Sequence, residues 1–80
     1  MIISVVEPGK PTRWEYRVFD RIGKYADGAA SITVRSFEGS YAELMDHFRF
    51  SAFLASEEGN IGLLISLIFI LLDEVRNPSA

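Results

Sequence analysis

The chain of 80 residues has no cysteine and only one histidine. Without cysteine it can form no disulfide bond and can offer no thiolate to a metal ion. A metal site built from other ligands needs several histidines or clustered carboxylates at ligand spacing, and the sequence shows no such cluster. Stability must therefore come from a hydrophobic core, which association with a second copy would extend. We expect no metal and no cofactor.

Signatures of catalysis are also missing. No serine lies in a G-x-S-x-G elbow, and the glycines form no phosphate-binding loop. The single histidine, His47, is interpreted as an incidental residue of a helix surface, because no nucleophile and acid accompany it in a recognisable pattern. The adjacent acids Glu57-Glu58 and Asp73-Glu74 are interpreted as solvated helix ends. The sequence therefore predicts no catalytic residue and a protein that is not an enzyme.

No apolar run is long enough to cross a membrane. A membrane-spanning helix needs about 20 apolar residues, whereas the longest run, residues 61–72, is followed at once by Asp73. The N-terminal apolar stretch ends at Glu7 and has no basic leader, unlike a secretory signal. We expect a cytoplasmic protein with no membrane partner.

Alternation of apolar and polar side chains predicts three short strands, over residues 2–7, 13–22 and 29–37. The proline- and glycine-rich residues 8–11 separate the first two strands, and residues 23–28 are predicted to form a hairpin loop before the third. Loops this short connect antiparallel neighbours. The first half of the chain therefore predicts a three-stranded antiparallel sheet.

Helical periodicity follows. A first helix is predicted over residues 41–56, and Ser40 with Glu43 fits a capping box at its start. A second helix is predicted over residues 61–76, with Asn60 as its N-cap. The expected core stripe of the first helix consists of Tyr41, Leu44, Met45, Phe48, Ala52 and Ala55. The predicted fold class is α+β, with both helices packed on one face of the sheet (βββαα), in a single small globular domain over residues 1–80.

The second helix is apolar over roughly 220° of its circumference. The narrow stripe left for water consists of Gly62, Ser66 and Asp73, flanked by Phe69 and Arg76. Two interpretations of the wide apolar arc stay open. The sheet and the first helix cover it completely, or a homodimer forms through residues 61–76 and covers the remainder.

The back of the first helix carries a candidate partner-binding surface. Its members are Phe50, Phe53 and Leu54, which project among Glu43 and Asp46. Exposed aromatic side chains beside carboxylates are typical of protein-binding patches. The alternative is that the helix bends near Arg49 and turns these side chains inward.

The second strand carries another candidate surface. Trp14, Tyr16 and Val18 are expected to face the helices. The opposite face is expected to present Arg13, Glu15, Arg17, Phe19 and Arg21, joined across the sheet by Arg35. Arginines with an aromatic side chain between them can stack on bases, clamp phosphates or bind the carboxylates of a protein. The alternative is an ordinary solvated sheet face with cross-strand ion pairs.

Charge is unevenly distributed along the chain. The formal net charge is −3, and residues 37–80 carry seven acidic side chains against two basic ones. The sequence predicts a small non-catalytic protein-binding module that binds a protein partner whose identity it leaves open. One specific form is a stoichiometric inhibitor or antidote, of phage or bacterial type, that acts on a nucleic-acid-handling enzyme. The alternatives are a structural homodimerisation domain and a nucleic-acid binder that uses the arginine face, which the acidic balance disfavours.

Overall fold

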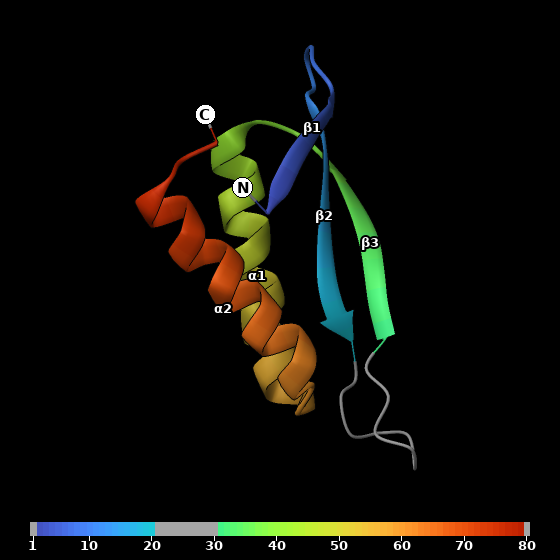
Figure 1. Cartoon of the computed structure of the whole chain (residues 1–80), viewed down its shortest axis with the longest axis vertical. Helices are drawn as coiled ribbons and strands as arrows, with labels where there is room; N and C mark the ends of the chain where they lie inside the picture. Colours follow the sequence, from blue (N-terminus) through green and yellow to red (C-terminus); the bar gives the residue numbers. More distant parts are fainter. Residues whose placement is uncertain (1, 21–30, 80) are drawn as a thin grey trace.

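Three antiparallel strands form one sheet, and two helices cover one of its faces (Figure 1). The computed structural model describes residues 2–20 and 31–79. The elements in chain order are β1 (Ile3–Glu7), β2 (Arg13–Asp20), β3 (Ser31–Glu38), α1 (Tyr41–Glu58) and α2 (Ile61–Arg76). The predicted α+β fold and its βββαα order are confirmed. The predicted hairpin loop at residues 23–28 lies outside the described residues.

Local signals set the ends of the helices. The Ser40 hydroxyl accepts a hydrogen bond from the backbone N–H of Glu43, and the Glu43 carboxylate accepts one from the N–H of Ser40, as the capping box predicted. The α1 helix runs two residues further than predicted, because its last turn closes on Gly59 in the left-handed region at φ 69°. The Asn60 side chain then caps α2 by accepting from the N–H of Leu63.

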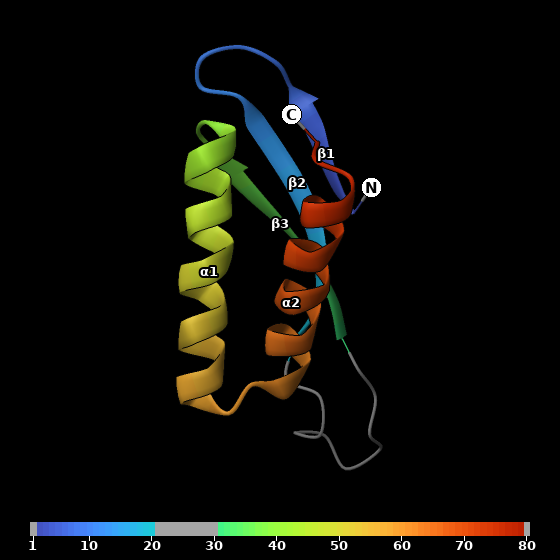
Figure 2. The ribbon, with the colours of Figure 1, turned by 90° about the vertical axis from the view of Figure 1, so that its left-hand side faces the viewer.

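The core lies between β2 and the two helices, which stand side by side in front of the sheet (Figure 2). Phe48 and Leu44 from α1 and Leu67 from α2 are fully buried there. The Phe48 ring meets the Tyr16 ring edge-on, with centroids 4.8 Å apart. The predicted core stripe of α1 is confirmed, with Tyr41 and Ala52 at its partly buried margin. This packing orients every surface described below.

The orientation of β3 differs from the prediction. Tyr16 pairs directly with Arg35, and directly paired residues point to the same face of a sheet. Arg35 therefore faces the helices and does not join the arginines of the outer face. Ile32 and Val34 lie on the outer face instead, where both are exposed. The physical reason is the buried Tyr16 hydroxyl, which needs a polar partner on its own face.

The inward face of α2 also differs from the prediction. Gly62 and Ser66, which were expected to face water, are buried. The Ser66 hydroxyl accepts a hydrogen bond from the backbone N–H of Phe19 at 2.8 Å. β1 pairs with β2 only as far as Tyr16, so the N–H of Phe19 lies beyond that pairing and takes its acceptor from α2. A small polar side chain is thus placed against the sheet, and larger apolar side chains are turned outward.

The interpretation of Asp73 and Glu74 as solvated residues is wrong. Asp73 is partly buried, and Glu74 is only 4% exposed. The Glu74 carboxylate accepts hydrogen bonds from the Tyr41 hydroxyl at 2.7 Å and from the backbone N–H and hydroxyl of Ser79, both at 2.8 Å. It therefore ties the last turn of α2 to the first residue of α1 and to the chain that follows α2. No helix among the described residues is long and apolar enough to span a membrane.

Candidate protein-binding surfaces

An extended apolar surface runs along the outer face of α2, and we call it the α2 stripe. Its members are exposed by between 43% and 81%, and they are Ile61, Ile65, Ile68, Phe69, Leu72 and Val75. Leu63, Leu67 and Ile70 occupy the opposite side of the helix and are buried in the core. The interpretation that the sheet and α1 cover the whole apolar arc is therefore wrong. A monomer with this surface leaves half of α2 unpartnered.

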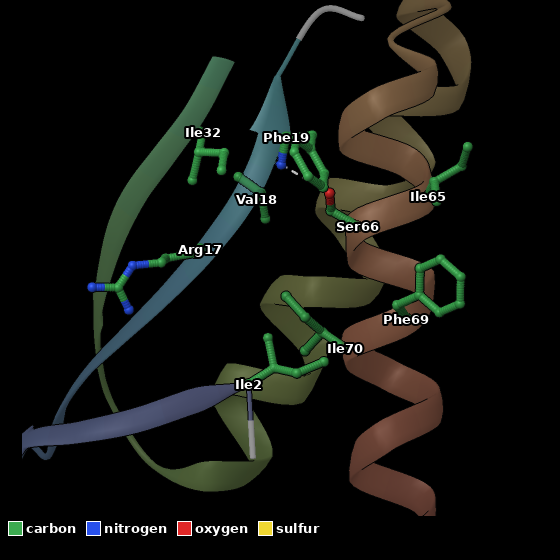
Figure 3. Close-up of a pocket in the computed structure, with 9 residues that line it drawn as sticks. All are labelled: Ile2, Arg17, Val18, Phe19, Ile32, Ile65, Ser66, Phe69 and Ile70. Carbon is green, nitrogen blue, oxygen red and sulfur yellow. Dashed lines mark hydrogen bonds between the residues drawn. The ribbon is translucent and has the colours of Figure 1, made fainter. Parts of the chain in front are cut away.

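An apolar groove of about 280 Å³ connects the α2 stripe to the end of β2 (Figure 3). Ser66 points across it toward Phe19, whereas Ile65 and Phe69 point away from β2. Arg17 stands at its margin and points away from α2. The groove has the size of the smallest ligand pockets, but its lining is almost wholly apolar, and the hydroxyl of Ser66 already accepts a hydrogen bond from the backbone. It extends an apolar surface and does not resemble a small-molecule site.

The flank of α1 presents the side chains that the sequence analysis singled out. Phe50 is 62% exposed and Phe53 59%, and Leu54 lies beside them at helical spacing. The helix continues unbroken through these residues to Glu58, so the alternative that they turn inward is wrong. Their role in binding stays a prediction.

Acidic side chains surround this flank. Asp46 lies one turn before Phe50, and Glu43 lies a further turn back. Sequence reasoning missed two neighbours, because it treated Glu57 and Glu58 only as a helix end. The i+4 spacing places Glu57 one turn after Phe53 and Glu58 one turn after Leu54. The basic residue on this flank, Arg49, already forms an ion pair with Asp46 at 2.9 Å. We call these three apolar side chains and four acids the α1 flank.

The outer face of the sheet carries mixed charge. Arg13 lies 3.6 Å from Glu7 and directly opposite Glu38, so its charge is neutralised locally. Arg17 pairs with Val34. Other described residues of this face include Glu15, Phe19 and Ile32. Arg21, the remaining predicted member, lies outside the described residues. Among the described residues of this face the acids are at least as numerous as the arginines, so these residues provide no excess of positive charge for phosphate binding.

His47 occupies a different environment from the predicted one. It is half-buried, its ring stacks on Phe37 with centroids 4.7 Å apart, and its Nε2 lies 2.7 Å from the Tyr16 hydroxyl. Arg35 also hydrogen-bonds this hydroxyl. When His47 is neutral, the hydroxyl donates to Nε2 and accepts from the guanidinium. Burial raises the pKa of Tyr16, and the positive charge of Arg35 opposes that rise.

This cluster is suited to a structural role. Tyr16 is 1% exposed, so no substrate can reach its hydroxyl. The hydrogen bonds satisfy the polar atoms that the core encloses. Within residues 2–20 and 31–79, no group of three or more potential metal ligands lies close enough together to hold an ion.

Burial and the charge of Arg35 lower the pKa of His47 from its ordinary value of 6.5. The unfolded chain therefore takes up a proton before the folded chain as the pH falls. We expect the free energy of unfolding to be independent of His47 above about pH 7 and to decrease below about pH 6.5. Urea denaturation at a series of pH values measures this decrease, and it should disappear in His47→Gln.

Two features allow the pH dependence to be assigned to His47. His47 is the only histidine, so one imidazole resonance in an NMR titration reports its pKa directly. The two acids nearest to His47 along α1 are Glu43 and Asp46. The hydrogen bonds of the capping box lower the pKa of Glu43, so Glu43 stays ionised between about pH 6 and pH 7. Asp46 forms an ion pair with Arg49. An imidazole pKa at or above 6.5 in the folded protein would contradict the prediction.

Comparison with known proteins found no matching family model, no matching curated sequence and no matching solved structure. The function of the chain is therefore inferred from its surfaces.

Proposed function

We propose that this protein is a non-catalytic protein-binding module that uses the α1 flank to bind a basic protein partner. One observation carries the proposal: two phenylalanines and a leucine stand exposed on a rigid, capped helix and are surrounded by carboxylates. Aromatic side chains are enriched among the residues that dominate binding energy, and a charged rim speeds docking onto an oppositely charged surface.

A nucleic-acid-handling enzyme is the partner class that best matches this surface. Such enzymes present basic surfaces to phosphate, and the α1 flank offers Glu57 and Glu58, neither of which forms an ion pair within the described residues. Carboxylates on a helix surface can compete with phosphate groups for the same basic side chains. The proposed action is stoichiometric inhibition by occupation of the enzyme surface.

The test immobilises three forms of the chain and applies a lysate of the source organism. The forms are the wild type, the double variant Phe50→Ser with Phe53→Ser, and the control Val34→Ser, an exposed apolar position on the outer face of β3. We expect one protein to be retained by the wild type and by the control, and to be lost from the double variant. Loss of two central aromatic contacts should weaken binding by at least about 100-fold.

Purified components complete this test. The retained protein should bind the chain one to one in calorimetry, its association rate should fall as salt rises, and its activity on nucleic acid should fall as chain is added. Equal retention of the same protein by the double variant, or no stoichiometric protein at all, would contradict the proposal.

A further inference from the structure

The exposed side chains of α2 follow the spacing of a coiled-coil seam. Ile61, Ile65, Ile68, Leu72 and Val75 are separated by four, three, four and three residues. This is the a/d pattern by which one helix packs its side chains between those of another. The buried stripe formed by Leu63, Leu67, Ile70 and Glu74 repeats the four, three, four spacing on the other side. α2 therefore has two stripes with the spacing of a helix-packing surface, and only the buried stripe packs against the rest of this chain.

The exposed seam is large enough to matter energetically. A whole aromatic side chain has about 150–250 Å² of surface, and an aliphatic one somewhat less, so the α2 stripe exposes on the order of 500 Å². The groove beside it adds Ile2, Phe19 and Ile32. The largest apolar patch on a typical monomer is about 300–600 Å², and a standard interface needs about 800 Å² per partner. The stripe and groove together approach the second value.

Charged side chains lie near both ends of the stripe. Glu57 and Glu58 precede the turn into α2, and Arg76 is its last residue. None of the three forms an ion pair within the described part of the chain. In an antiparallel pair of α2 helices, the end of each copy that follows Glu57 and Glu58 lies near Arg76 of the other copy. The two helix dipoles then point in opposite directions, which is the favourable arrangement for neighbouring helices. A parallel pair would place like charges together.

We propose that the α2 stripe is a homodimer seam in which α2 of one copy packs antiparallel against α2 of a second copy. One antiparallel register satisfies the apolar spacing. It places Ile65 opposite Ile68 of the second copy and Ile61 opposite its Leu72. Because the core already holds α2 in a helix, no folding of α2 opposes association.

A membrane surface is the competing occupant, and the charges disfavour it. Helices that lie on membranes carry lysine and arginine along their polar face. The acids near α2 are Glu57, Glu58, Asp73 and Glu74, against the single arginine Arg76. A helix with this charge pattern is repelled by anionic lipid.

The dimer leaves the apolar side chains of the α1 flank outside the seam on both copies, and Glu57 and Glu58 of the flank lie near the ends of the seam. The seam uses α2 and the proposed partner surface uses α1, so each proposal can fail without the other. Two linked copies of the α1 flank would bind a partner with two basic sites more tightly than one copy.

The first test measures mass in solution. Sedimentation of the wild type at about 50 μM should give twice the 9.0 kDa mass of the chain. Ile68→Glu should restore the mass of one chain and weaken self-association by at least about 100-fold. Phe50→Glu on α1, which places the same charge on another exposed apolar position, should remain dimeric. Far-UV circular dichroism confirms that each variant is folded. A wild type that sediments as one chain would overturn the proposal.

The second test determines the orientation. Because the chain has no cysteine, every disulfide formed must come from introduced thiols. Oxidation of a mixture of Ile61→Cys and Leu72→Cys chains should give the mixed disulfide. Predominant formation of Ile61→Cys homodimers would indicate a parallel pair and overturn the antiparallel seam. Binding of a monomeric wild type to phosphatidylglycerol vesicles would overturn the homodimer in favour of a lipid surface.

Discussion

Replacing Phe48 with alanine is expected to remove a large share of the stability of this protein. The side chain is fully buried where α1 crosses β2, and its ring packs edge-on against Tyr16. Truncating a buried phenylalanine costs about 3–5 kcal/mol, the sum of lost burial and the cavity left behind. A chain of 80 residues has about 4–12 kcal/mol of stability in total. Urea denaturation should therefore show a large decrease in the midpoint, or no folded baseline at all.

Phe50→Ala is the matched control for Phe48→Ala. Both changes replace phenylalanine with alanine in α1, so both carry the same small gain in helix propensity. Only the burial differs, because Phe50 is exposed. We expect Phe50→Ala to change the free energy of unfolding by no more than about 0.5 kcal/mol. All forms should be compared at one chain concentration, since self-association stabilises folded protein. Equal effects of the two substitutions would contradict the core described here.

Glu74→Ala is expected to produce the second largest loss of stability. The carboxylate accepts three hydrogen bonds from two residues, Tyr41 and Ser79, and hydrogen bonds to a charged group contribute about 1.5–3 kcal/mol each, without simple additivity. Two effects oppose the loss: the substitution also removes the cost of burying a charge, and it removes a negative charge from the C-terminal end of α2. We expect a net decrease of about 2–3 kcal/mol in the free energy of unfolding.

The position of Glu74 makes its effect testable locally as well as globally. Hydrogen exchange at the amide of Ser79 should accelerate in Glu74→Ala, because that N–H loses its acceptor. Tyr41→Phe should cost less than Glu74→Ala, and the double variant should cost less than the sum of the two. Glu57→Ala, which removes an exposed acid, should have no measurable effect. Unchanged exchange at Ser79 would show that the carboxylate does not hold this segment.

Local sequence signals predicted the elements of this fold well. The capping box of Ser40 and Glu43 and the cap at Asn60 act within a few residues of the chain, so they need no tertiary context. The periodicity of α1 likewise predicted which side chains enter the core and that Phe50 and Phe53 stay outside. The same helical spacing, continued by four residues, would also have identified Glu57 as a neighbour of Phe53.

The inward face of α2 was not predictable from its own residues. Hydropathy alone turns Ser66 toward water, because Leu and Ile surround the helix on nearly every side. Ser66 faces the sheet because the N–H of Phe19 lies beyond the pairing of β1 with β2 and takes its acceptor from α2. That need exists only after the strands have paired with unequal lengths.

Arg35 and His47 illustrate the same limit. Each is polar, and each looks like a surface residue in the sequence. Both lie against the buried Tyr16 hydroxyl, which has to be hydrogen-bonded inside a low-dielectric core. The partners of a buried polar group are set by which strands and helices meet, and residues 16, 35 and 47 are far apart along the chain.

The amino-acid order alone determined the βββαα succession, the absence of thiol chemistry and the excess of apolar surface in α2, because caps, turns and periodicity act over a few neighbouring residues. Tertiary packing alone decided which side of α2 stays outside. An apolar helix can pack in a core through several of its faces. α2 packs through the face on which the Ser66 hydroxyl accepts a hydrogen bond from the N–H of Phe19 in β2. The stripe left outside lies opposite the buried side of α2, which holds Leu63, Ser66 and Leu67.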